Sequence, residues 1–100
     1  MSYQYIFLER AQEEYEDALS WYKEGSLKAT ENFIEELNSK VSLICEDPLR
    51  YRNTYKNYRE TSLKKFPYSV IYFIDEVDKT IIIQSVFHHK RNPRKKYKKK

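Results

Sequence analysis

The chain has 100 residues, of which 40% are hydrophobic and 34% charged, with a net charge of +4. This length fits one domain, and the composition excludes a disordered chain, while the lack of about 20 consecutive apolar residues excludes a membrane span. One glycine, one cysteine and two histidines exclude glycine-rich phosphate loops and give no ligand spacing for a metal site, so we expect no metal and no cofactor.

The N-terminal quarter predicts a short strand followed by a helix. Residues 3–8 are aromatic and β-branched, which favours a strand. From Arg10 onward, apolar residues recur at three- and four-residue steps with acids between them, which indicates an amphipathic helix. The helix should end near Gly25, and we expect this glycine to adopt the left-handed conformation that follows many helices.

A second helix is expected between Ser26 and Pro48. Ser26 is a residue type that caps helix N-termini, and Pro48 disfavours helical continuation before it. An apolar stripe runs through this segment at helical spacing; its members are Leu27, Thr30, Phe33, Leu37, Val41 and Ile44, widened by Ile34. Two helices joined this tightly should form an αα-hairpin whose apolar faces point to one side.

The second half of the chain predicts strands. Residues 49–58 are irregular, 59–66 resemble a strand with one polar face, and 68–74 and 80–88 are strong strands around a polar turn at 75–79. The element order is therefore β-α-α-β-β-β. We expect an α+β domain in which the last three strands form an antiparallel meander, the first strand joins it, and the helix hairpin packs on one face.

Charge is distributed unevenly along the chain. Residues 1–47 carry eleven acids and four bases, whereas residues 48–100 carry four acids and fifteen bases. A basic half on a small domain indicates a partner with negative charge, namely nucleic acid, an acidic protein segment or an anionic surface. The lysine-rich residues 94–100 are expected to form a basic tail outside a domain of residues 1–93. A lone cysteine and no secretory signal favour the cytoplasm.

Three stretches of the sequence together match a known pattern. They are Ala18-Leu19-Ser20-Trp21-Tyr22, Arg59 followed by Leu63-Lys64-Lys65-Phe66-Pro67-Tyr68-Ser69-Val70-Ile71-Tyr72, and Val86-Phe87-His88-His89-Lys90-Arg91-Asn92-Pro93. Asp47-Pro48 closes the second predicted helix in the same pattern. On these residues the chain resembles the RelE/ParE superfamily of type II toxin–antitoxin toxins, in particular the ParE-like plasmid stabilisation branch, over about residues 5–93.

The resemblance implies a small antiparallel sheet with an N-terminal strand and helix hairpin, and a toxin that inhibits growth until a cognate antitoxin binds it. Three functions follow from the superfamily. The first, which we favour, is a non-enzymatic inhibitor of DNA gyrase or a related target. The second is a ribosome-dependent mRNA endoribonuclease of the RelE type, which needs no metal. The third is an inactive toxin-fold protein that only binds a partner. A homodimer or a toxin–antitoxin hetero-oligomer is compatible with each function.

The endoribonuclease hypothesis predicts specific catalytic residues. Cleavage by a 2′-hydroxyl needs a base, an acid and positive charge at the phosphate. By resemblance, the catalytic candidates are Arg59, Lys65 and Arg91, with His88 and Tyr97 as weaker ones. Residues expected to contact phosphate or the target are Arg59, Lys64, Lys65, Lys90 and Arg91.

Each candidate also has a structural interpretation. His88 suits a histidine at a strand end that is bonded to backbone, which is the reading we favour. The two arginines could instead pair with Glu60, Asp75 or the acidic helix face, which contributes little stability at a surface. The tyrosines of residues 51–58 could stack on bases or pack a loop over the sheet. Trp21 and Tyr22 are expected to pack the first helix on the sheet.

Overall fold

The computed structural model describes residues 3–91 and residue 96. The described part folds into five strands and two helices. In chain order these are β1 (Gln4–Phe7), α1 (Glu9–Gly25), α2 (Leu27–Glu46), β2 (Arg52–Tyr55), β3 (Tyr58–Ser62), β4 (Tyr68–Asp75) and β5 (Thr80–His88). None of the helices in this part is long and apolar enough to span a bilayer.

The strands form one mixed sheet in the order β1-β5-β4-β3-β2. From β2 to β5, each strand pairs antiparallel with the next strand in the chain, which confirms the predicted meander. The N-terminal strand β1 lies parallel to β5, so it joins the sheet beside the last strand. The predicted α+β fold class is therefore correct, with the addition of a short edge strand and one parallel pair.

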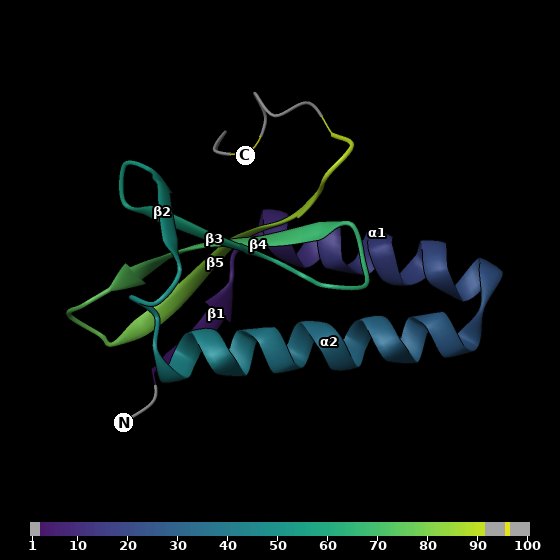
Figure 1. Ribbon diagram of the computed structural model, residues 1–100, viewed down its shortest axis with the longest axis horizontal. Coiled ribbons are helices and arrows are strands. Elements are labelled where there is room, and N and C mark those ends of the chain that lie inside the picture. The colour runs from purple at the N-terminus through teal and green to yellow at the C-terminus, as the bar shows by residue number, and fades with distance from the viewer. Residues whose placement is uncertain (1–2, 92–95, 97–100) are drawn as a thin grey trace.

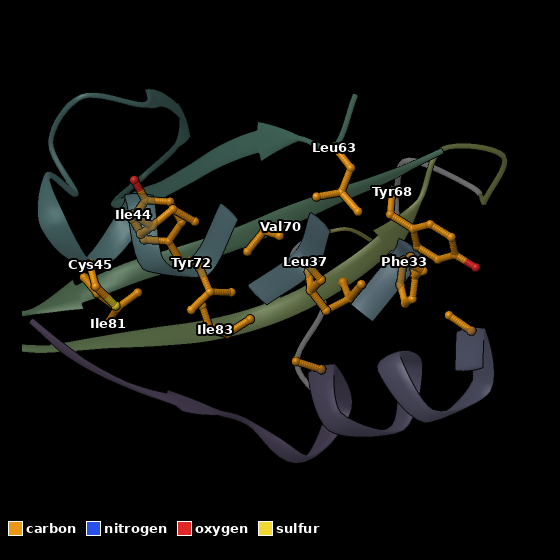
Figure 2. Close-up of a cluster of buried hydrophobic side chains, with 14 residues drawn as sticks. Phe33, Leu37, Ile44, Cys45, Leu63, Tyr68, Val70, Tyr72, Ile81 and Ile83 are labelled. Carbon is orange, nitrogen blue, oxygen red and sulfur yellow. The ribbon is translucent and has the colours of Figure 1, made fainter. Parts of the chain in front are cut away.

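Both helices cover the same side of the sheet, and the α1–α2 connection lies at the opposite end of the molecule from the β4–β5 turn (Figure 1). Side chains of α2 such as Phe33, Leu37 and Ile44 share one core with Tyr68, Val70 and Tyr72 of β4 (Figure 2), and the ring centroids of Phe33 and Tyr68 lie 5.2 Å apart. Tyr72 is fully buried, and its hydroxyl donates to the carbonyl of Pro48 at 2.6 Å. This core fixes the helix hairpin on the sheet, because burial of large apolar side chains is the main stabilising contribution to folding.

The other side of the sheet, which we call the helix-free face, has a second and smaller cluster. Tyr58, Ile71 and Phe87 are buried there, and Phe73 packs against them. Two cations lie over the ring of Phe87, with Arg91 and Lys96 each 5.7 Å from its centroid. Long basic side chains thus cover part of this face with their apolar stems.

Three local predictions differ from the structure. The segment 49–58 contains strand β2, which the sequence did not indicate because its four residues lie at a sheet edge and are mostly exposed. The strand predicted over 59–66 ends at Ser62, and the chain then turns as an irregular loop. Gly25 is the last residue of α1 and has no positive φ. A left-handed residue is not needed there, because the extended Ser26 starts α2 directly.

Candidate functional site

Most of the predicted basic residues gather at one end of the sheet, where the β3–β4 loop meets the turn that follows β5. Tyr68 and His88 are paired across β4 and β5 at this end, and the N–H of His89 donates to the carbonyl of Pro67 at 2.8 Å. The exposed cations of the two segments are Lys64, Lys65, Lys90 and Arg91. We call these four residues the basic end.

Glu36 of α2 fixes the loop that carries the two adjacent lysines. Its carboxylate accepts the backbone N–H groups of Lys64 and Lys65, the latter at 3.2 Å. In a strand, two adjacent side chains would point to opposite faces. This segment is a loop, so that rule does not apply to Lys64 and Lys65. Both lysine side chains are exposed at the basic end.

Arg91 is tied to helix α1 through Glu14. The Glu14 carboxylate accepts a hydrogen bond from an Arg91 Nη1–H, and it also accepts from the Ser85 hydroxyl at 2.7 Å and the Val86 N–H at 3.0 Å. Arg10 donates to the same carboxylate at 3.3 Å. The side chain of Glu14 is only 11% exposed, and that of Arg91 is 42% exposed. Arg91 therefore has a structural partner, as one of the two readings of this residue expected.

Glu14 itself was not among the predicted site residues, because it lies on the face of α1 that the sequence assigned to solvent. The structure explains its position. Strand β1 pairs only as far as Ile83 of β5, so the remaining half of β5 has an open edge. Glu14 caps this edge by accepting the Val86 N–H. The available signal was Arg10, four residues before Glu14, which forms the favourable i,i+4 pair.

Arg59 lies apart from the basic end. It is paired with Tyr72, whose side chain is in the helix-side core, so Arg59 points to that side. Its guanidinium donates to the carbonyls of Tyr51 at 2.6 Å and Leu49 at 3.4 Å. Three residues of β3, roughly 10 Å, separate it from the Ser62 end of the strand. Arg59 thus holds the segment between α2 and β2 against the sheet.

The two histidines make separate contacts. The His88 ring meets Tyr68 edge-on, with 4.9 Å between the centroids, and its Nδ1 accepts the Lys90 N–H at 3.0 Å. Burial, followed by the neighbouring His89 and Lys90, lowers the pKa of His88, so its ring is neutral near pH 7. The Nε2 of His89 lies 2.9 Å from the hydroxyl of Ser69 on the helix-free face. These contacts fit the structural reading of His88.

Tyr97, the weakest catalytic candidate, lies outside the described residues. Lys96 is described, and its amine lies 3.0 Å from Glu60 of β3. This pair places a tail residue over the helix-free face, where it also covers Phe87. Among the described residues, no group of three histidine, cysteine or acidic side chains could hold a metal ion.

A hollow of about 510 Å³ runs from the basic end to helix α1. Its lining combines charged and apolar side chains, namely Glu14, Asp17, Ala18, Trp21, Tyr68, Val86, His88 and Arg91. The expectation that Trp21 packs on the sheet is wrong, because this side chain is 70% exposed. Its neighbour Tyr22 does pack inward, 5.3 Å from the ring of Phe33. One wall of this hollow is therefore a large exposed indole.

A family model described as "ParE toxin of type II toxin-antitoxin system, parDE" matches residues 5–93. The chain belongs to the ParE toxin family. The match covers the basic end, Arg59 and Glu14, and it confirms the resemblance that the sequence motifs indicated. A comparison with curated proteins finds no match.

Solved structures with this fold include both ParE-type and RelE-type toxins. A chain of the chromosomal ParDE system from P. aeruginosa superposes with a TM-score of 0.73 at 11% identity, covering 87% of this chain and 96% of that one. The isolated E. coli RelE toxin gives 0.63 at 18%, covering 92% and 89%. The intact E. coli RelBE toxin–antitoxin complex gives 0.63 at 18%, covering 90% and 100%. At these identities the likeness establishes the RelE/ParE fold, and a fold does not by itself determine an activity.

Proposed function

We propose that this ParE-family toxin arrests growth by binding DNA gyrase or a related replication target, and that it does so without cutting RNA. The observation that carries the proposal is the separation of the nuclease candidates. Arg59 lies on the helix side of the sheet and holds backbone carbonyls. Lys65 lies in the β3–β4 loop, and Arg91 is bound by Glu14. A phosphate at the basic end would lie away from Arg59, whose guanidinium is bonded to the backbone carbonyls of Tyr51 and Leu49.

The helix-free face supports the same reading. Glu60 and Ser62 of β3 and Ser69 of β4 lie on this face at the end nearest Arg91. The cations that lie on this face, Arg91 and Lys96, are paired with Glu14 and Glu60, which reduces the positive charge that they could offer to a phosphate as it becomes dianionic. His88 is a poor general acid near pH 7, because its lowered pKa leaves it without a proton to give. The exposed cations of the basic end are therefore better suited to binding a target protein than to cutting RNA.

The experiment that tests this function is pulse-labelling of DNA and protein synthesis after the toxin alone is induced in bacteria. We expect DNA synthesis to fall first, and the purified protein to inhibit supercoiling by gyrase. An early fall in protein synthesis, together with mRNA cuts on translating ribosomes, would overturn the proposal in favour of a RelE-like nuclease. Normal growth on induction would also overturn it and would leave a toxin fold that only binds a partner.

The same part of the molecule is suited to an antitoxin tail. Antitoxin tails that alternate apolar and acidic residues can dock in a groove as helices or strands. The hollow beside Trp21 would accept the apolar side chains, and the basic end would attract the acids. Large exposed aromatic residues are frequent affinity hot spots, and opposite charges speed association. We therefore propose that the cognate antitoxin covers Trp21 and Lys65 together.

A further inference from the structure

A second hollow, of about 750 Å³, lies away from the basic end. It is formed where the helix-free face meets the segment between β1 and α1 and the β2–β3 turn. Its lining residues are Leu8, Glu9, Arg10, Asn57, Tyr58, Phe73 and Gln84. The volume is in the range of small-molecule sites, about 300–1,000 Å³. The residues that the growth-inhibition proposal uses do not line it.

Gln84 is the most informative residue of this hollow. It is only 4% exposed, yet its amide makes no hydrogen bond within the described part of the chain. In that part no side-chain N or O atom that is sealed from solvent lacks a partner. The amide of Gln84 therefore reaches the hollow, where it offers one donor and one acceptor side by side. An amide buried this deeply is costly unless something in the hollow bonds to it.

Aromatic rings form the wall next to this amide. Phe73 and Tyr58 meet edge-to-face, 5.7 Å apart at an angle of 89°. Tyr55 is stacked on Tyr58 at 6.4 Å and 11°, and it is 45% exposed. Flat, partly exposed rings of this kind bind planar ligands, and stacking of one base on an aromatic residue contributes about 1–3 kcal/mol in nucleic-acid complexes.

The charges around the hollow indicate which kind of ligand it could bind. The lining contains one acid and one base, Glu9 and Arg10, so neither sign of charge prevails there and we expect the part of the ligand that enters to be neutral. The adjoining β2–β3 hairpin carries the exposed cations Arg52 and Lys56, and the Lys56 amine lies 5.3 Å from the ring of Tyr55. The surroundings thus suit a neutral planar ring attached to a negatively charged group outside.

From these contacts we infer that the hollow is a nucleobase-binding site. The base stacks on Phe73 or Tyr58, and the Gln84 amide pairs with an adjacent donor and acceptor on its edge, as glutamine does with adenine. The phosphate, which is joined to the base through the ribose, lies towards Lys56. The base can belong to a free nucleotide or to a single strand, since both present the same ring and phosphate. This site needs neither gyrase nor an antitoxin.

The test is an NMR titration of the ¹⁵N-labelled protein with AMP, GMP, CMP and UMP in turn, and with a short single-stranded RNA. The side-chain amide signal of Gln84 should shift on binding. In Gln84→Leu the affinity should fall about tenfold or more. This variant should fold normally, because it exchanges an unbonded amide for an apolar group of similar size. Gln12→Leu is the matched control, since Gln12 is exposed on α1 and should leave binding unchanged.

The titration distinguishes a nucleotide site, a single-strand site and the absence of a site. Binding of a mononucleotide that depends on Gln84 supports a nucleotide site, and binding of the RNA alone with the same dependence supports a single-strand site. RNA binding that is equal in the wild type and Gln84→Leu would show only charge attraction and would overturn the inference. Binding weaker than roughly 1 mM for every probe would also overturn it and would mean that the hollow holds water.

Discussion

Replacing Glu14 tests the physical role assigned to this residue. Its carboxylate receives hydrogen bonds from Ser85, Val86 and Arg10, together with the Arg91 guanidinium. In Glu14→Ala the amide and hydroxyl of β5 lose their acceptor, and Arg10, whose side chain is 11% exposed, loses its ion pair with Glu14.

The size of the effect follows from these contacts. Removing one partner of a buried ion pair costs about 3–5 kcal/mol. The pair with Arg91 adds little, because that side chain is 42% exposed and exposed pairs contribute up to about 1 kcal/mol. We expect the free energy of unfolding to fall by about 3 kcal/mol, out of the 5–15 kcal/mol that is usual for a domain. The melting temperature should then fall by roughly 12–24 °C.

Urea unfolding followed by circular dichroism measures this loss. Glu14→Gln should lose less, because its side chain keeps one acceptor oxygen. Glu16→Ala is the matched control, since Glu16 is exposed on the same helix and bonds only Gln12 among the described residues, and its effect should stay within about 0.5 kcal/mol. A loss in Glu14→Ala as small as that of Glu16→Ala would refute the capping role of Glu14.

Three further outcomes are expected. Trp21→Ala should weaken binding to the antitoxin encoded beside the toxin by about 30-fold, which corresponds to the loss of about 2 kcal/mol at a hot spot. The control Val77→Ala, at the distant β4–β5 turn, should leave the affinity unchanged. Calorimetry measures both affinities, and equal values for the two variants would exclude Trp21 from the interface. Burial, with smaller contributions from nearby Tyr22 and Asp17, raises the pKa of Tyr68 to about 12, so stability should decline as the pH rises from about 10 to 12, because only the unfolded state then releases this proton. Tyr68→Phe should flatten that decline in urea unfolding, and an unchanged slope would contradict the assignment. Because burial lowers the pKa of His88, its ring signals in an NMR titration should change below the ordinary value of about 6.5, and stability should fall as the pH drops through that range; a midpoint above 6.5 would contradict the burial.

Most of the fold could be predicted from the sequence because its strong elements follow local rules. The apolar stripe of α2, the Ser26 cap and the two central strands have periodicities and end signals that need no tertiary information. Ser26 indeed accepts the Ala29 N–H at 3.0 Å. Strand β2 could not be predicted, because an exposed edge strand forms through its partner's hydrogen bonds rather than through its own pattern.

The candidate site was harder to predict because its geometry depends on distant contacts. Composition and motifs identified the cations of the basic end, and the structure brings Lys64, Lys65, Lys90 and Arg91 to one end of the sheet. The contact between Glu14 and Arg91 spans 77 positions and has no local signature. The direction of Arg59 depends on the register between β3 and β4, which one residue of slippage would reverse. Roles for these residues in growth arrest stay predictions.

The parallel pairing of β1 with β5 also determines when this protein can finish folding. The first strand has no place in the sheet until the last strand is present, since its hydrogen bonds go to residues 80–83. Contacts this far apart in sequence form slowly. A nascent chain that still lacks β5 therefore carries an unattached N-terminal strand and a helix α1 without its Glu14 anchor. The protein becomes a complete folded domain only after nearly all of its described residues have left the ribosome, so the assembled sheet is absent for most of its own synthesis.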